Sequence, residues 1–372
     1  VSAHLSNTTL ALAQQGTRIT VGTTASAGWT AFDVVRQSGM HAASRALLIE
    51  PAQDYLLLMT SGSTGQPKPI ILSQQTKQLR IQSAVELYGV TDHDVTMAAT
   101  PLYHSLAQRL VLLPLTTGGT SVLLAHFTPA LWMNAAACHR VSFTIAVSSQ
   151  LKQMLGLLKA TSTPLPAMRC IVSSSALLDE ETKRQLVAQL HCDFHECYGA
   201  SEIAFGSNLS PDAGEHKLGS VGVAIPGACI RVVDEQGCPV PTGMAGEIVC
   251  STPMRFSGYY KQPRVTEAAY VDGCFRTGDL GRLDEDGFLY FLGRIKDIVI
   301  SGGINVYPQD IEDVVASLGF VRECAVIALP DERLGEVVGL VYALSTDAPA
   351  DAQREIQRAC MARLADFQQP RK

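Results

Sequence analysis

The sequence predicts an α/β fold in three consecutive parts: a layered α/β core, a small, mainly antiparallel β unit, and a small α+β C-terminal domain. Three observations predict it. From about residue 54 to 197, short apolar runs typical of strands alternate with helix-like segments. From about residue 219, Gly and Pro turns separate short β runs. Beyond about residue 294, a one-faced apolar helix pattern precedes a further strand pattern.

Five apolar runs of the core are expected to be strands: residues 56–59, 122–124, 143–147, 170–172 and 194–197. Between the last two, Asp179, Glu180 and Glu181 predict the first turn of a helix, because acidic side chains there complement the helix dipole. We expect this helix to continue to about Leu190.

The β unit contains short runs at residues 231–234 and 247–250 and a hairpin over 283–292 that turns at Asp286 and Gly287. Beyond it, Pro308 predicts a helix start and Gly319 its end. The side chains expected on its apolar face are Ile311, Val314, Val315 and Leu318. A strand over 325–329 should follow.

The composition excludes several classes of protein. The chain has 372 residues, 47% of them hydrophobic, and a net charge of −6 with both signs interspersed, so no basic patch points to nucleic acid. Apolar runs such as residues 110–115 are far shorter than the roughly 20 residues of a membrane span. We expect no membrane span, no nucleic acid partner and a cytoplasmic location.

The ten cysteines are scattered singly and form no CxxC pair, which argues against a zinc site or a disulfide framework. We therefore interpret them as reduced thiols with a packing role. Cys197 could instead be a nucleophile, although no histidine is placed in the sequence so as to suggest its activation.

A loop rich in small hydroxyl residues and glycine follows the strand predicted at 56–59. It reads Thr60-Ser61-Gly62-Ser63-Thr64-Gly65-Gln66-Pro67-Lys68. Its hydroxyls, its exposed amides and the Lys68 charge suit phosphate oxygens, whereas the common P-loop needs its lysine to open a helix. Taken alone, the loop could also be a solvated turn.

In sequence, this loop resembles the phosphate loop of the adenylate-forming superfamily, which includes acyl-CoA synthetases, peptide-synthetase adenylation domains and luciferases. Further segments that resemble this family follow in the same order: Pro101-Leu102-Tyr103-His104, Tyr198-Gly199-Ala200-Ser201-Glu202, Gly219-Ser220-Val221-Gly222, Tyr259-Tyr260, Arg276-Thr277-Gly278-Asp279-Leu280-Gly281, Gly293-Arg294-Ile295-Lys296-Asp297 and Ser301-Gly302-Gly303-Ile304-Asn305-Val306-Tyr307-Pro308. The resemblance implies a large AMP-binding domain over residues 1–294 and a small mobile C-terminal domain over 295–372. The β unit, at about 219–294, would belong to the large domain.

The resemblance also implies a reaction. ATP would activate a small carboxylic acid to an acyl-adenylate, with release of pyrophosphate, and the acyl group would pass to the thiol of coenzyme A. Mg²⁺ would accompany ATP. Two alternatives stay open: an acyl-AMP ligase that loads the phosphopantetheine of an acyl carrier protein, and a non-catalytic module that binds nucleotide or acyl groups.

Site residues are implied by the same resemblance. The predicted catalytic residues are Thr60, Lys68, His104 and Glu202, and Glu202 would also ligate Mg²⁺. The predicted nucleotide-binding residues are Ser61, Gly62, Ser63, Thr64, Gly65, Ser174, Ser175, Ala176, Tyr198, Gly199, Ser201, Asp279 and Arg294.

Individual roles follow from the family. The loop would hold the β- and γ-phosphates, Asp279 would accept hydrogen bonds from the ribose hydroxyls, and Arg294 would contact ribose or phosphate. Tyr198 would stack on adenine, near the serines that replace the glycines usual at 173–175. Lys296 falls at the hinge of the small domain, with Gly302 and Gly303 near the pantetheine channel.

The sequence says less about which carboxylic acid is the substrate. Members that activate amino acids carry an Asp just beyond the His104 region, but residues 105–109 contain no carboxylate, which favours a plain carboxylic acid. The expected walls of the acyl pocket are Val147, Ser148, Cys197, Ala200 and Ile203. Arg109 could pair with a second carboxylate if it points inward, but the cost of burying an unpaired arginine favours an outward orientation.

Both ends of the chain depart from the family pattern. Only 59 residues precede Thr60, fewer than in relatives. The sequence reaches Gln369-Pro370-Arg371-Lys372 without the Pro-x-x-x-x-Gly-Lys stretch whose lysine contacts the α-phosphate. We therefore expect a shortened N-terminal part, a truncated C-terminal domain and weak adenylation by the chain as given.

Overall fold

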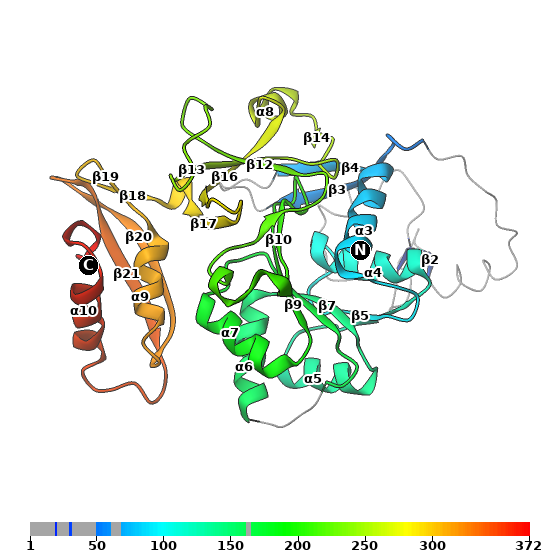
Figure 1. Cartoon of the computed structure of the whole chain (residues 1–372), viewed down its shortest axis with the longest axis horizontal. Helices are drawn as coiled ribbons and strands as arrows, with labels where there is room; N and C mark the ends of the chain where they lie inside the picture. Colours follow the sequence, from blue (N-terminus) through cyan, green and yellow to red (C-terminus); the bar gives the residue numbers. More distant parts are fainter. Residues whose placement is uncertain (1–18, 21–29, 32–49, 61–67, 161–164) are drawn as a thin grey trace, which may run out of the picture. The chain divides into compact units, whose positions relative to one another are not determined.

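The computed structural model describes residues 19–20, 30–31, 50–60, 68–160 and 165–372 (Figure 1). The chain divides into two compact units, residues 1–50 and 51–372. In the first unit, β1 (Ile19–Thr20) and β2 (Thr30–Ala31) pair in parallel. Every element discussed below belongs to the second unit.

The largest sheet among the described residues has seven strands in the order β11-β10-β9-β8-β7-β5-β6. Neighbours from β6 to β9 are parallel, and β10 and β11 join the β9 edge antiparallel. The strands are β5 (Val95–Ala98), β6 (Thr120–Leu123), β7 (Phe143–Val147), β8 (Cys170–Ser174), β9 (Asp193–Tyr198), β10 (Ser207–Leu209) and β11 (Val223–Ala224). Four of the five predicted core strands lie in this sheet, and the predicted α/β class is confirmed.

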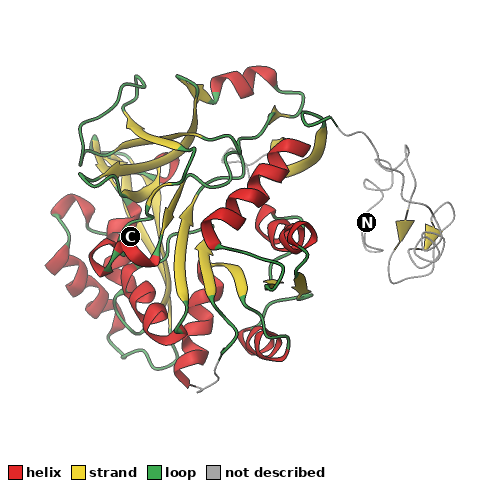
Figure 2. Ribbon diagram, turned by 45° about the vertical axis from the view of Figure 1, so that its right-hand side comes forward, coloured by secondary structure: helices red, strands yellow, loops and turns green. Residues whose placement is uncertain are grey.

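Helices cover both faces of this sheet (Figure 2). They are α3 (Gln74–Tyr88), α4 (Ser105–Thr117), α5 (Pro129–Cys138), α6 (Ser148–Ala160) and α7 (Glu180–Leu190). The helix predicted from Asp179 to Leu190 is confirmed, and its first turn is closed by the Asp179 carboxylate, which accepts a hydrogen bond from the Thr182 amide. Gly89 and Gly118 end α3 and α4 in the left-handed region, where glycine is favoured.

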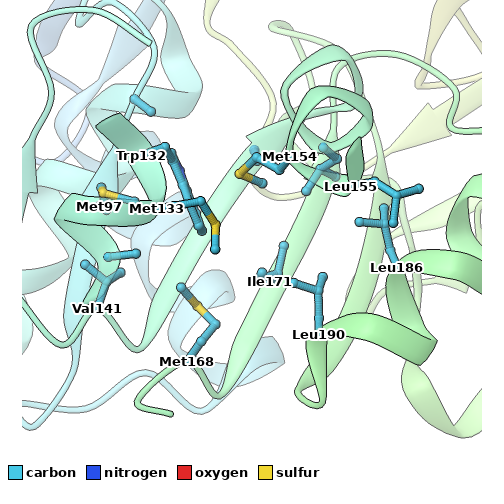
Figure 3. Close-up of a cluster of buried hydrophobic side chains, with 14 of the residues drawn as sticks. Met97, Trp132, Met133, Val141, Met154, Leu155, Met168, Ile171, Leu186 and Leu190 are labelled. Atoms are coloured by element: carbon cyan, nitrogen blue, oxygen red, sulfur yellow. The ribbon is translucent and has the colours of Figure 1, made fainter. Parts of the chain in front are cut away.

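Two hydrophobic cores result, one on each face. Figure 3 shows the first, in which Trp132, Met154 and Leu190 of α5, α6 and α7 pack toward Ile171 of β8. In the second, α3 and α4 pack on the opposite face, against the β8 neighbours of Ile171, such as Val172. Because successive strand residues point to opposite faces, one strand serves both cores. Ligand access is then expected at the ends of the strands.

A separate three-stranded antiparallel sheet holds β3 (Asp54–Thr60), β4 (Lys68–Ser73) and β14 (Gly258–Tyr259). The strand predicted at 56–59 therefore exists, but it does not belong to the parallel core as expected. Residues 61–67 connect it to β4, and a parallel crossover needs about a dozen residues or more, so antiparallel pairing follows.

The predicted β unit is antiparallel throughout its described strands. The order is β12-β13-β16-β15, and β17 pairs with β16. These strands are β12 (Cys229–Val233), β13 (Gly246–Ser251), β15 (Tyr270–Val271), β16 (Cys274–Leu283) and β17 (Leu289–Arg294), with α8 (Pro263–Ala268) before β15. The predicted hairpin is β16–β17, and Gly287 in its turn has φ 81°.

The C-terminal elements form a four-stranded antiparallel sheet with its own core. The order is β19-β18-β21-β20, and Ile311 and Val315 of the predicted helix pack with Val338 and Ile356. The elements are β18 (Val299–Ser301), β19 (Ile304–Val306), α9 (Pro308–Ala316), β20 (Val321–Asp331), β21 (Gly335–Leu344) and α10 (Ala352–Arg363). The boundary between residues 294 and 295 stays a prediction. Among the described residues, no helix combines the length and apolar character that crossing a membrane requires.

Candidate functional site

A cavity of about 650 Å³ lies where the parallel strands β8 and β9 end and β16 and β17 approach them. Ligands of α/β sheets bind beyond the carboxyl ends of parallel strands, and small-molecule sites measure roughly 300–1,000 Å³. The polar residues of its wall are Lys68, His104, Ser105, Arg109, Ser174, Ser175, Ser201, Glu202, Glu247, Tyr259, Arg276, Thr277, Asp279 and Arg294. The apolar part of the wall includes Leu106, Ala204, Phe205 and Phe275.

Asp279 carries a buried acceptor atom at this cavity. The Tyr198 hydroxyl donates to its Oδ2 at 2.8 Å, and Arg294 Nε forms an ion pair with Oδ1 at 3.1 Å. Asp279 and Arg294 are register partners on β16 and β17, which explains the ion pair. Oδ1 makes no hydrogen bond with any described residue, although buried acceptors are nearly always paired. A donor supplied by a ligand, such as a ribose hydroxyl, would satisfy it.

The ionisation of Asp279 is set by opposing effects. Burial raises the pKa of its carboxyl, whereas the Arg294 charge and the Tyr198 hydrogen bond oppose the rise. Tyr198 itself is not among the residues that line the cavity: its side chain packs with Val221 and Ile248. Burial raises the pKa of Tyr198 well above its ordinary value, so its hydroxyl stays protonated and remains a donor. The predicted stacking of Tyr198 on adenine stays a prediction.

Glu202 presents the second carboxylate of the wall. The Tyr259 hydroxyl donates to Glu202 Oε1 at 3.1 Å. The Glu202 backbone is also held, because its carbonyl accepts from the Phe256 amide at 2.7 Å. Mg²⁺ binds hard oxygen ligands and often takes one or two carboxylates together with phosphate oxygens and water. The residue fits the predicted magnesium role, and the structure does not otherwise test that role.

Glu247 is a wall residue that the sequence reasoning missed. Arg276 donates to its Oε2 from Nε at 2.9 Å and from Nη2 at 2.5 Å, and the Gly278 amide donates to Oε1 at 3.2 Å. These bonds hold the backbone immediately before Asp279. The available signal was a carboxylate inside an otherwise apolar strand run, residues 247–250, because buried carboxylates are rare unless paired.

The other predicted residues divide into four groups. Lys68, His104, Ser174, Ser175, Gly199, Ser201 and Arg294 line the cavity, whereas Ala176 does not. The Ala176 carbonyl instead accepts a hydrogen bond from the Ser148 hydroxyl. Thr60 is the last residue of β3, and nothing is described of its side chain. Ser61, Gly62, Ser63, Thr64 and Gly65 lie outside the described residues.

Two backbone features shape this wall. A Cβ on Gly199 would lie 1.8 Å from the Ala204 carbonyl oxygen, so only glycine fits there. Ser175 has φ 79°, in the left-handed region that glycine adopts readily. The serine thus takes the conformation for which the family's glycines are suited.

The predicted acyl walls are only partly found. Ala200 lines the cavity, but Val147, Ser148, Cys197 and Ile203 do not. The prediction that Arg109 points outward is wrong: Arg109 is 6% exposed, it lines the cavity, and its guanidinium carbon lies 3.7 Å from the centre of the Phe205 ring. Attraction to the aromatic face offsets part of the cost of burial that argued for the outward orientation.

Cys197 shows no features of a nucleophile. Its side chain is buried, and burial raises the pKa of its thiol to about 11. The thiolate, which is the reactive form, is therefore scarce near neutral pH. All ten cysteines are free thiols, and five of them are buried: Cys170, Cys197, Cys250, Cys274 and Cys360.

Comparisons with known proteins identify the family. Residues 6–260 match the model of the AMP-binding enzymes, and residues 310–372 match the AMP-binding enzyme C-terminal domain. Indoleacetate–CoA ligase from Aromatoleum aromaticum is 30% identical over 346 residues, which are 92% of this chain and 68% of the relative.

Two solved structures extend the similarity to three dimensions. ATP-bound MatB from Rhodopseudomonas palustris superposes with a TM-score of 0.83 at 31% identity, covering 91% of this chain and 67% of that one. O-succinylbenzoate coenzyme A synthetase from Bacillus subtilis, in complex with ATP and magnesium ion, superposes with a TM-score of 0.79 at 28% identity. The match covers 90% of this chain and 70% of that one. The chain thus spans about two thirds of the length of these relatives. Together with the cavity and its carboxylates, these matches confirm the resemblance: the chain belongs to the family of AMP-binding enzymes.

Proposed function

We propose that this protein activates a small carboxylic acid with ATP and transfers the acyl group to the thiol of coenzyme A. The observation that carries the proposal is the buried Oδ1 of Asp279, which is paired with Arg294 but accepts no hydrogen bond from a described residue, in a cavity that Glu202 also lines. The named relatives support the class of reaction, since one is an indoleacetate–CoA ligase and another an o-succinylbenzoate coenzyme A synthetase. Their acids differ, so they do not define the acid used by this chain.

In the first half-reaction, an oxygen of the acid's carboxylate attacks the α-phosphorus of ATP. A P–O bond forms to the acid, the bond between the α-phosphorus and the bridging oxygen breaks, and pyrophosphate leaves. Phosphoryl chemistry of this kind depends on positioning and charge neutralisation. Asp279 orients the ribose, Lys68 offsets the phosphate charge, and Glu202 would hold Mg²⁺, which neutralises developing charge when bound.

In the second half-reaction, the sulfur of a deprotonated thiol attacks the acyl carbonyl, and AMP leaves with the bonding electron pair. We propose that His104, at the N-terminus of α4 and in the cavity wall, contacts the acid near the α-phosphate. We also propose that residues 295–372 move as a domain about Lys296, which lies half exposed in a short 3-10 turn (Ile295–Asp297).

Exchange of pyrophosphate into ATP, measured across aliphatic and aryl acids, tests the first half-reaction. At least one acid should drive exchange, and Glu202→Gln and Asp279→Asn should each lower it by about 100-fold or more. Glu235→Gln, a change at an exposed carboxylate outside the cavity, is the matched control and should retain exchange. Normal exchange in both site variants would contradict the assignment, as would a complete lack of exchange with the unmodified protein.

The acceptor is tested separately. After adenylation, free coenzyme A and a holo acyl carrier protein are each offered, and thioester formation is followed by mass spectrometry. We expect thioester with coenzyme A. Loading of the carrier protein alone would identify an acyl-AMP ligase instead.

A further inference from the structure

Three cations are buried together where α3 and α4 approach the cavity. Lys77, Arg80 and Arg109 are 6%, 2% and 6% exposed. None of them forms an ion pair with a carboxylate among the described residues, whereas buried charges in proteins are normally paired. Burial and the neighbouring positive charges lower the pKa of Lys77 to about 8. Because no carboxylate of the described residues is paired with these side chains, the cluster carries an excess of positive charge.

Two of the three cations are held by neutral oxygens. Lys77 Nζ donates to Gln108 Oε1 at 3.1 Å. Arg80 donates from Nε to the Met254 carbonyl at 3.0 Å and from Nη2 to the Ser201 carbonyl at 2.9 Å. These bonds fix both side chains behind the wall, and neither residue lines the cavity.

Arg109 differs from both. Its guanidinium makes no hydrogen bond with any described residue, and its one ring contact is the stack over Phe205, at 3.7 Å. A guanidinium has five N–H donors in a planar fork, so most of its bonding capacity is unused. Among the three cations, Arg109 alone lines the cavity.

Arg109 shares the cavity wall with three apolar residues from its own sequence segment and that of Phe205. Leu106, Ala204 and Phe205 line the same cavity and pack against or within the second hydrophobic core. Arg109 is five residues beyond His104 on α4, about 7.5 Å further along the helix axis. His104 and Arg109 line the same cavity, so an acid whose reacting carboxylate lies near His104 can present its far end to Arg109.

We propose that the acid substrate is a dicarboxylic acid, and that Arg109 binds the carboxylate that does not react. This proposal rests on the proposed function and specifies its substrate class. Arg109 would hold that carboxylate through two parallel N–H donors, the preferred geometry of arginine with carboxylates. Lys77 and Arg80 contribute positive potential from behind without contacting the substrate. The apolar walls accommodate the carbon chain between the two acid groups.

Matched substrate pairs test this proposal directly. Succinate, glutarate, adipate and the benzenedicarboxylates are compared with their monomethyl esters, which keep the shape and lose the second charge. Pyrophosphate exchange gives kcat/KM for each acid. The unmodified protein should favour at least one diacid over its ester by about 10-fold or more, as expected for a charge-assisted bond.

Substitution of Arg109 should remove that preference. In Arg109→Met, kcat/KM for the diacid should fall about 10- to 100-fold, while kcat/KM for the monoester is retained or rises. Arg109→Lys should keep part of the preference, since it keeps the charge and loses the fork. Arg184→Met, at an exposed arginine of α7, is the control and should leave the ratio unchanged. The KM for ATP and the thermal midpoint report whether each variant remains folded.

The results of these experiments distinguish a failure of the diacid proposal from a failure of the proposed function. If monocarboxylic acids drive exchange and the ratio of diacid to ester is the same in Arg109→Met, the diacid proposal is wrong and the proposed function stands. If Arg109→Met lowers exchange with both acids equally, Arg109 is structural and the diacid proposal is again wrong. If Arg109→Met does not fold, Arg109→Lys replaces it in the test. An unchanged ratio of diacid to ester in Arg109→Lys would then show that the diacid proposal is wrong. If no acid drives exchange, the proposed function itself fails, and this proposal with it.

Discussion

The Tyr198 hydroxyl donates a hydrogen bond of 2.8 Å to Asp279 Oδ2 and thereby connects two sheets. Tyr198 is the last residue of β9 in the seven-stranded sheet, and Asp279 lies within β16 of the antiparallel β unit. The other oxygen, Oδ1, is paired with Arg294 Nε at 3.1 Å and accepts no hydrogen bond from a described residue. The orientation of one carboxylate oxygen thus depends on a side chain from another sheet.

We predict that Tyr198→Phe raises the KM for ATP by about 3- to 10-fold, because a neutral hydrogen bond contributes roughly 1 kcal/mol and Asp279 would lose one of its two anchors. Steady-state pyrophosphate exchange at varied ATP measures this. Tyr290→Phe, on β17, is the control and should leave the KM for ATP unchanged. An unchanged KM in Tyr198→Phe would mean that Arg294 alone orients the carboxylate.

Gly199→Ala should disrupt the cavity wall. The added methyl group would meet the Ala204 carbonyl oxygen at 1.8 Å, and the backbone must shift to relieve the clash. We expect a loss of about 1–3 kcal/mol or more in unfolding free energy, together with weakened exchange. Gly156→Ala, in α6 with nothing within 4 Å, should instead stabilise the protein by about 0.5–1 kcal/mol. Urea denaturation measures the unfolding free energy of both variants, and equal values would contradict the prediction.

A buried ion pair between Lys183 and Glu196 ties α7 to β9. Their side chains are 0% and 2% exposed, and Lys183 Nζ also donates to the Leu218 and Ser220 carbonyls at 2.7 and 2.9 Å. Lys183→Met leaves the Glu196 carboxylate buried without its counter-charge, so we expect a loss of about 3–5 kcal/mol. Lys159→Met, at an exposed lysine of α6, should cost little. Comparable denaturation midpoints for the two variants would refute this.

Asp94 should make stability depend on pH in the acid range. Burial opposes ionisation of Asp94, but hydrogen bonds from Arg169, Ser142 and the Thr91 amide lower the pKa of its carboxyl from 3.8 to about 2. The unfolded chain therefore binds this proton more readily than the folded one. Its stabilising contribution is complete above pH 3.8 and is lost as the pH falls toward 2.

Urea denaturation between pH 6 and about 2 measures this effect. Asp94→Asn should be less stable than the unmodified protein at pH 6, and its stability should fall less steeply below pH 4. Asp92→Asn, two residues away and exposed, is the control. Parallel curves for Asp94→Asn and the unmodified protein would contradict the prediction.

The sequence predicted the elements whose formation depends on residues close together in the chain. The helix from Glu180 to Leu190 was predicted from the acidic residues at its start, and the β16–β17 hairpin from its Asp-Gly turn. These features depend on residues a few positions apart.

Contacts between residues that are far apart in the chain could not be predicted from the sequence. Tyr198 and Asp279 are 81 residues apart, and Glu247 and Arg276 are 29 apart. The orientation of Arg109 depends on Phe205, and the four strands β6, β7, β8 and β9 lie between these two residues in the chain. Only the fold determines which of these residues meet.

The register of β16 against β17 has a consequence for changes in chain length. Asp279 faces Arg294 on the far side of an irregularity between Leu280 and Gly281. Since strand residues alternate between faces, deleting one residue between Asp279 and the hairpin turn would send the carboxylate to the opposite face while leaving the hairpin paired. Insertions or deletions within the strand before the turn at 284–288 should therefore be selected against in homologues, whereas Gly287 within the turn is constrained by its φ of 81°. In this hairpin, the number of residues is therefore constrained as well as their identity.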